Sequence, residues 1–286
     1  MKILTTFCIA LLAAPAGFSA SSLTAQQVID RIKEQIAVTL PENTVDTFKA
    51  GNPETPVKGI AVTMMATEDV LERAAASGKN LIITHEPTFY GHLDKTAELE
   101  RQNDAVLADK QKFIADHQLV VWRFHDGWHK RRPDGILLGM TKALGWEKYQ
   151  STTQLHLFTL PETKLSDLAS DAKRKLGIRI VRVVGEPDLK VSKIGLMPGA
   201  AGSQRQIELL EKSEVEVLVI GETPEWETVE YVADAATQHK HKALLILGHI
   251  PSEQAGMEEC ARWLPTFIPE VPISFIAAKE PFWPAK

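Results

Sequence analysis

The sequence predicts an α/β protein of two linked lobes, each with a parallel or mixed sheet flanked by helices. Short apolar runs alternate with helical segments along the chain, which is the pattern of βαβ units. The 286 residues can bury one large core or two modest ones. A content of 44% hydrophobic and 24% charged residues is typical of a globular protein rather than a disordered one.

The first half of the chain carries three predicted strands separated by helices. Apolar residues from Val28 to Ile36 recur at helical spacing. Thr67 is a typical helix N-cap, followed by acidic residues in the first turn. The expected elements of this half are a helix over 26–37, a strand over 59–62, a helix from Thr67 to Gly78, a strand over 80–84, a helix over 96–117 and a strand over 119–122.

The second half repeats the alternation after Gly145. Its expected strands lie at 155–160, 178–184, 191–197, 215–220, 243–247 and 271–276, and its expected helices lie at 165–176, after 203, at 226–238 and at 252–264. The predicted division is therefore an N-terminal lobe over 21–150 and a C-terminal lobe over 151–286. The end of the second lobe, from about 243 to 286, is expected to pack back on the first.

The first twenty residues predict a secretory signal peptide over 1–20. Met1-Lys2 is followed by a nearly continuous apolar run and then by small residues, with cleavage expected between Ala16 and Ser22. The alternative is a membrane anchor, but the apolar run is shorter than the ~20 residues that a span requires. We therefore expect a periplasmic or secreted protein that is not bound to a membrane after cleavage.

Charge and cysteine content limit the expected binding partners and disulfide bonds. The formal net charge is -5, and the sequence has no extended block of Lys and Arg residues, so nucleic acid is not an expected partner. Cys260 would be the only cysteine of the mature chain and could form no internal disulfide. The expected ligand is a small molecule whose identity the sequence does not specify.

Histidines and carboxylates gather where three apolar strands end. Ligands of open α/β sheets collect beyond the carboxyl ends of strands, so residues at these ends can converge. The residues concerned are His85 and Glu86 after the second strand, His125, Asp126 and His129 after the third, and His249 and Glu253 near the end of the chain.

Imidazole and carboxylate donors together suit a divalent transition metal such as Zn, Mn, Fe, Co or Ni. His249 and Glu253 are four residues apart and would share one face of a helix. His125 and His129 have the same spacing, although Gly127 disfavours a helix there. Each pair alone is more often a hydrogen-bonded pair than a metal site. The occurrence of all three after buried strands favours a site for one or two ions.

Three short motifs resemble those of a known family. They are Thr84-His85-Glu86-Pro87, His125 with His129, and Gly248-His249 with Ser252-Glu253. Over residues 45–275 the chain resembles the Ngg-interacting-factor-three-like family of dinuclear-metal α/β proteins, also described as type 2 GTP cyclohydrolase-like. Glu86 stands where that family has a second histidine, and His129 stands where it has an aspartate.

The resemblance implies a ligand set and an assembly. The implied ligands are His85, Glu86, His129, His249 and Glu253, with His125 and Asp126 as further candidates. The exchange at Glu86 and His129 would keep a mixed set of imidazoles and carboxylates. The family also implies a homo-oligomer, a hexamer with its sites facing an internal cavity.

Two functions follow as hypotheses. The first is an exported metal-dependent hydrolase, in which Asp126 or Glu222 would act as the general base. The alternative is a non-catalytic metal-binding or assembly protein of the same fold, because an altered set of ligands can retain an ion without activating a water.

Overall fold

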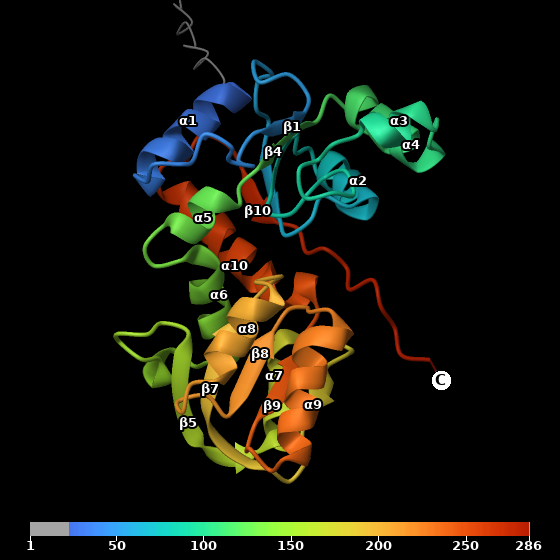
Figure 1. Cartoon of the computed structure of the whole chain (residues 1–286). Helices are drawn as coiled ribbons and strands as arrows, with labels where there is room; N and C mark the ends of the chain where they lie inside the picture. Colours follow the sequence, from blue (N-terminus) through green and yellow to red (C-terminus); the bar gives the residue numbers. More distant parts are fainter. Residues whose placement is uncertain (1–22, 286) are drawn as a thin grey trace, which may run out of the picture.

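The computed structural model describes residues 23–285, which form two α/β lobes (Figure 1). The predicted signal peptide over 1–20 lies outside these residues. In the described part of the chain, no helix combines the length and the apolar character needed to cross a membrane.

The first lobe is built on a five-stranded mixed sheet. In sheet order its strands are β1 (Phe48–Ala50), β4 (Val120–Arg123), β3 (Leu81–Thr84), β2 (Ile60–Thr63) and β10 (Ile273–Phe275). Only the edge strand β1 is antiparallel to its neighbour. Thr63, Thr84 and Arg123 are aligned by the register, so β2, β3 and β4 end at the same edge of the sheet. This edge places the residues after β3 and β4 next to one another.

Helices cover the first sheet, and one of them departs from expectation. They are α1 (Ala25–Ile36), α2 (Glu68–Ala76), α3 (Ala97–Arg101), α4 (Ala105–Asp116) and α5 (Asp126–Lys130). The single helix expected over 96–117 is wrong, because the chain breaks between α3 and α4. Asn103 adopts a φ of 52°, and the Asp104 side chain accepts a hydrogen bond from Leu107 N to start α4. Strand β1 was also not expected from the sequence.

The second lobe contains the other five-stranded mixed sheet. Its strands, in sheet order, are β5 (Leu157–Lys164), β7 (Lys190–Met197), β8 (Val217–Ile220), β9 (Ala243–Ile246) and β6 (Arg182–Val184). The central three are parallel, and both edge strands are antiparallel. Its helices are α7 (Leu165–Leu176), α8 (Ser203–Leu210), the π-helical turn η2 (Glu225–Val229) and α9 (Glu230–Thr237). The predicted fold class, two lobes with mixed sheets flanked by helices, is confirmed.

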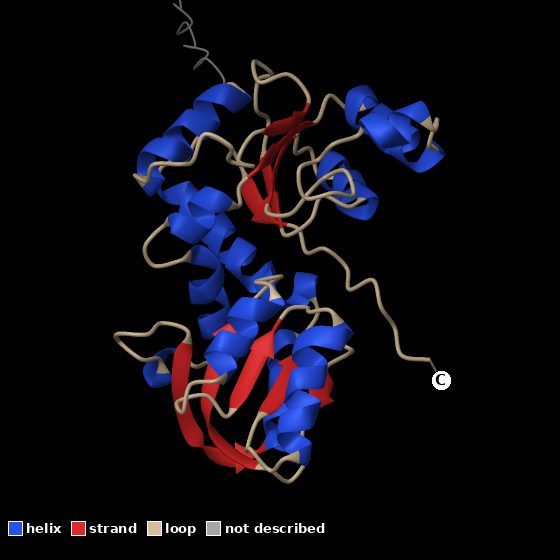
Figure 2. Cartoon of the chain, in the orientation of Figure 1, coloured by secondary structure: helices blue, strands red, loops and turns tan. Residues whose placement is uncertain are grey.

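Two helices join the lobes, α6 (Gly135–Leu144) and α10 (His249–Trp263), as Figure 2 shows between the two sheets. They approach so closely that a Cβ on Gly139 would lie 2.5 Å from the Cα of Gly256. α10 starts after β9 and buries Met257 and Cys260 in the core of the first lobe. The short 3₁₀ helices η1 (Glu147–Tyr149) and η3 (Leu264–Thr266) complete the fold.

The return of the chain to the first lobe begins later than the expected residue 243. Strand β9 belongs to the second sheet, so the crossing starts with α10 at His249. That helix begins three residues before the expected 252, and it therefore includes His249 in its first turn. After α10, strand β10 pairs with β2 in the first sheet.

Candidate metal centre

His85 lies at the centre of the site, at the end of β3, and is completely buried. Its Nδ1 is 3.0 Å from the carbonyl oxygen of Phe124. Because a carbonyl only accepts, Nδ1 carries the hydrogen and Nε2 presents its lone pair to the cluster. Burial, and then the neighbouring His129 and His125, lower the pKa of His85 well below its usual value. The ring is therefore neutral, as a metal ligand requires.

His125 precedes the short helix α5, His129 lies within it, and both pack around His85. Their ring centroids lie 4.7 Å and 5.0 Å from that of His85. His125 Nδ1 is 3.0 Å from Asp126 Oδ1, and His129 Nδ1 is 2.9 Å from Asp134 Oδ2. One nitrogen from each of the three histidines lies within 4.8 Å of the other two. The three rings can therefore share an ion.

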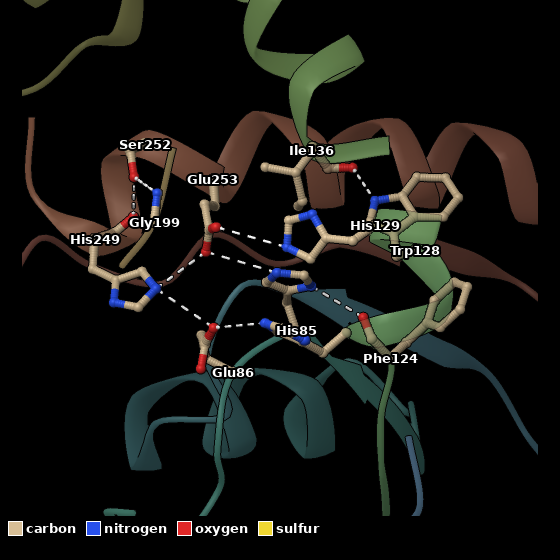
Figure 3. A network of polar contacts seen from close by, with 12 residues as sticks. His85, Glu86, Phe124, Trp128, His129, Ile136, Gly199, His249, Ser252 and Glu253 are labelled. Carbon is tan, nitrogen blue, oxygen red and sulfur yellow. Dashed lines mark hydrogen bonds and ion pairs between the residues drawn. The ribbon is translucent and has the colours of Figure 1, made fainter. Parts of the chain in front are cut away.

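A second group of donors faces the first from Glu86, His249 and Glu253 (Figure 3). His249 Nε2 is 3.4 Å from Glu86 Oε1 and 3.2 Å from Glu253 Oε2. His249 and Glu253 lie on one face of α10, as their spacing predicted. Glu253 also reaches the first group, since its Oε2 is 3.7 Å from His85 Nε2. The six candidate ligands thus form one continuous cluster.

The four imidazoles share one orientation. In each, Nδ1 faces an oxygen acceptor outside the cluster, and Nε2 faces into it. The fourth acceptor is Glu222, whose Oε1 is 3.4 Å from His249 Nδ1. An acceptor on the outer nitrogen fixes the tautomer and the ring orientation of a metal-ligating histidine. The cluster has this feature at every histidine.

The electrostatics around His249 favour positive charge. Burial alone would lower the pKa of His249, but the carboxylates of Glu222, Glu253 and Glu86 raise it to about 12. In the same way, Asp134, Glu253 and Glu86 outweigh burial and raise the pKa of His129. Both shifts have the same cause, a cluster of carboxylates with few cations, and this environment suits a bound metal ion.

Arg123, at the end of β4, is a buried residue of the site that the sequence analysis missed. Its NH2 nitrogen donates to Glu86 Oε2 at 3.0 Å, and its Nε donates to the carbonyl of His85 at 2.9 Å. These bonds occupy the outer oxygen of Glu86 and leave Oε1 facing the cluster. The signal in the sequence was an arginine at the end of an apolar strand. A charged side chain is buried in such a place only when it is paired, so Arg123 indicated a nearby carboxylate.

Asp46 is the other missed residue, and it supports α5. It is buried and accepts hydrogen bonds from the backbone nitrogens of His125, Asp126 and Gly127 at 2.8, 2.8 and 2.7 Å. Three N–H donors fix the start of a five-residue helix that would be unstable alone. Burial raises the pKa of Asp46, which the three backbone bonds partly offset.

The two predicted general bases lie on the outer side of the histidines. Asp126 uses one oxygen on His125 and the other on Thr44 Oγ1 at 2.8 Å and Val45 N at 3.3 Å. Both oxygens are therefore committed to orienting the backbone and His125. Glu222 follows β8, and its side chain is 53% exposed. Of the two, Glu222 has the more exposed carboxylate, since the Asp126 side chain is 25% exposed.

Two buried atoms of the cluster test whether these residues fit a metal. Within residues 23–285, His85 Nε2 and Glu253 Oε2 are buried without a hydrogen-bond partner. Each such atom costs on the order of 1–3 kcal/mol when left unsatisfied. Donor atoms of His85, Glu86 and Glu253 lie within 4.8 Å of one another. A cation would satisfy both orphaned atoms, so the residues fit a metal ion.

Comparison with known proteins agrees with the motifs. The model of the family described as Duf34/NIF3 (NGG1p interacting factor 3) matches residues 23–281. The chain belongs to the Duf34/NIF3 family. The family predicted from the three motifs is thereby confirmed.

Relatives of this Duf34/NIF3 chain cover most of its length. A Chlamydia pneumoniae protein named GTP cyclohydrolase 1 type 2 homolog is 24% identical over 251 residues, which are 82% of this chain and 90% of that protein. A Clostridium acetobutylicum protein of the same name is 23% identical over 214 residues, 71% of this chain and 75% of that protein.

Solved structures show the same fold. A Bacillus cereus protein related to NIF3 has a TM-score of 0.72 at 14% identity, over 93% of this chain and 100% of that one. A Staphylococcus aureus hypothetical protein also has a TM-score of 0.72, at 16% identity, over 92% of this chain and 100% of that one.

In this Duf34/NIF3 chain, Glu86 and His129 are the two residues at which the motifs were expected to differ from those of the family. Both direct a donor atom toward the cluster. Glu86 Oε1 is 3.6 Å from His125 Nε2, and His129 Nε2 is 4.0 Å from Glu253 Oε1. A cavity of about 570 Å³ opens beside them, and five of the six candidate ligands line it, all except the fully buried His85. Arg205 and His156 lie on its other walls. The cluster is thus accessible to a small molecule.

Proposed function

We propose that this protein is a metal-dependent hydrolase that uses one or two divalent ions. The observation that carries the proposal is the pair of orphaned buried atoms, His85 Nε2 and Glu253 Oε2, beside an open cavity that Glu253 lines. The ligands would be His85, Glu86, His125, His129, His249 and Glu253. Nitrogen and oxygen donors without a thiolate favour Zn, Mn, Fe, Co or Ni. Such an ion supplies Lewis-acid polarisation of a substrate oxygen and acidifies a water.

The chain's own contribution is to orient its ligands and to accept a proton. Asp126, Asp134 and Glu222 hold three of the four imidazoles with Nε2 directed inward. Glu222 is the proposed general base, because its carboxylate is the more exposed one and it adjoins His249. Asp126 is less suited, since both its oxygens are already bonded.

Metal analysis combined with a hydrolysis screen tests this proposal. We expect purified protein to retain metal, to hydrolyse at least one ester, amide or phosphoester class, and to lose that activity on chelation. Glu222→Gln should lower kcat by about 10²–10⁴-fold with the metal retained. Glu227→Gln, an exposed glutamate in the π turn, is the matched control and should have no effect. Hydrolysis that survives full removal of metal would disprove the mechanism.

The second candidate is a non-catalytic metal-binding or assembly protein. The observation in its favour is that Asp126, Asp134 and Glu222 each contact a histidine, so every carboxylate around the ligands already has a structural partner. This function predicts tight metal retention with no turnover across the same substrate classes.

We further propose that the protein is exported to the periplasm or secreted, on the strength of the pattern over residues 1–20. N-terminal sequencing of the product should find a start between Ala16 and Ser22, and an intact Met1 would refute export. We also propose a homo-oligomer, a hexamer by family resemblance. Light scattering that gives a stable single-chain mass would refute the assembly.

A further inference from the structure

A second cavity shares His249 with the one described above. Its volume is about 540 Å³, and its walls are the C-terminal segment from Glu280 to Trp283 and the second lobe around β9. We call this cavity the tail groove. Its apolar lining is Met65, Ile180, Ile246, Leu247, Ile250, Pro251, Pro281, Phe282 and Trp283. Ile246, Leu247 and Ile250 are buried and belong to the fixed wall.

Arg179 holds the C-terminal wall of the groove in place. Its backbone N donates to Glu280 Oε2 at 2.9 Å. Its NH2 nitrogen donates to the carbonyl oxygens of Glu280 at 2.8 Å and Phe282 at 2.6 Å. These bonds leave the side chains of Phe282 and Trp283 67% and 69% exposed at the groove. Two adjacent exposed aromatic rings on the wall of a cavity indicate a binding surface.

The inner end of the tail groove is polar. Glu222 and His249 form it, with Glu222 Oε1 3.4 Å from His249 Nδ1. The other charged residues of the lining have partners elsewhere, since Arg182 pairs with Glu225 at 2.7 Å and Glu280 pairs with Arg179. Glu222 is therefore the carboxylate that a molecule in the groove would meet. A carboxylate recognises a hydrogen-bond donor.

We propose that the tail groove binds a small amphipathic molecule with an aromatic or branched aliphatic body and an N–H donor directed at Glu222. The volume is that of a small-molecule site, and few convergent polar groups in an apolar lining are typical of such sites. His249 belongs to both the tail groove and the metal cluster. Molecules of this chemical class are therefore also the substrates we propose for the hydrolase, a step that rests on the proposed function. Binding itself does not depend on that function.

Fluorescence titration with N-phenyl-1-naphthylamine, an apolar aromatic amine, tests the proposal on the metal-free protein. We expect saturable binding with one molecule per chain. Replacing both rings, Phe282→Ala with Trp283→Ala, should weaken it about tenfold, which is about 1.4 kcal/mol. Arg179→Ala should also weaken it, because the wall loses its anchor.

Matched control variants distinguish binding in the tail groove from non-specific adsorption of the probe. Trp226→Ala removes another exposed tryptophan, 77% exposed, that does not line the groove. Arg174→Ala removes an exposed arginine that pairs with Asp171 on α7. Both should bind as the unaltered protein does. A second probe, 1-phenylnaphthalene, lacks the N–H group and should compete at least about tenfold more weakly, as expected for one lost hydrogen bond to a carboxylate.

Several outcomes would overturn the proposal. Unsaturable binding, equal affinity for the two probes, or equal loss in the controls and the tail variants would each show non-specific adsorption. Tighter binding in the Phe282→Ala, Trp283→Ala variant would show that the tail's own rings fill the groove. Absence of metal or of hydrolysis, by contrast, would count against the proposed function and leave this titration unchanged.

Discussion

The carboxyl ends of the two sheets meet at the same cluster but contribute different things. After β3 and β4 of the first sheet come His85 and His125, whose side chains donate to the site. After β7 and β8 of the second sheet come Gly199 and Gly221, which have no side chain to offer. A Cβ on Gly199 would lie 2.2 Å from Glu253 Oε1, and one on Gly221 would lie 2.5 Å from Ser252 Oγ.

The difference shows that β3 and β4 are followed by donors, whereas β7 and β8 are followed by glycines that leave space. The donors that follow the second sheet, His249 and Glu253, come from α10 after β9. The first turn of α10 fits against the second sheet only because these glycines leave room for Ser252 and Glu253. Gly199 N donates to Ser252 Oγ at 2.9 Å, which fixes the loop against the helix. The glycines are therefore as necessary to the geometry of the site as the ligands.

The lobes also differ in how much charge they bury. The first lobe buries Asp46, Lys110 and Arg123 close to the site. In the described part of the second lobe, leaving aside α10, the buried polar side chains are Gln206 and Thr228, which are uncharged. Buried charge costs stability unless it is paired. Asp46 accepts backbone hydrogen bonds, Arg123 pairs with Glu86 and Lys110 donates to a carbonyl oxygen, so each buried charge of the first lobe depends on its partner.

The largest expected effect is on metal content. His85→Ala and His249→Ala should each weaken metal binding by more than about 100-fold, because loss of a direct ligand exceeds the 10–100-fold cost of losing a residue that orients one. Glu253→Gln should act in the same direction but less, since it keeps the size and loses the charge. Metal per chain, measured beside circular dichroism, tests this. The exposed His239→Ala is the control, and folded His85→Ala with full metal would show that the site is elsewhere.

The second largest effect concerns the room that Gly199 leaves for the side chain of Glu253. Gly199→Ala should lower the free energy of unfolding by about 3 kcal/mol, since it combines a positive φ with overpacking against Glu253. Gly202→Ala in the same loop is the matched control. Its φ is also positive, at 87°, but an added Cβ would meet nothing within 4 Å. Equal destabilisation of the two variants in urea would contradict the steric role of Gly199.

The smallest effect concerns the buried charge of Lys110. Burial lowers its pKa to about 8, while its Nζ donates to the Thr88 carbonyl at 2.7 Å. Between pH 8 and 10.5 the unfolded chain binds more protons at this lysine than the folded one, so stability rises with pH there. Relative to Lys110→Met, the unaltered protein should gain about 2 kcal/mol between pH 7.5 and pH 10. A constant difference between the two urea unfolding curves would refute the shifted pKa.

The convergence of several candidate ligands was predictable because it depends on local patterns. An apolar strand followed by a histidine places His85 and His125 at a sheet edge, and the four-residue spacing of His249 and Glu253 places both on one helical face. The fold class was predictable for the same reason, since strands and helices have different periods of hydrophobicity.

Residues that act through long-range contacts could not be predicted in this way. Asp46 caps a helix about 80 residues away, as its hydrogen bond to Asp126 N shows. Asp134 is only five residues from His129, but it orients that ring across the turn into the next helix, which no helical or strand spacing predicts. The short strand β1 lacks an apolar run and is defined by its pairing with β4. The break before Asp104 was present in the sequence as an N-cap, but the helical pattern on both sides concealed it.

Helix α10 links the angle between the two lobes to the geometry of the candidate metal site. Its first turn carries His249 and Glu253, while Met257 and Cys260 are fixed in the core of the first lobe. A movement of the second lobe that displaces the first two turns of α10 would change the distance between these two donors and the remaining four. Occupancy of an ion held by these six donors would then be coupled to the angle between the lobes. A molecule that holds the lobes at the chelating angle would tighten metal binding, and the metal would tighten binding of that molecule by the same factor.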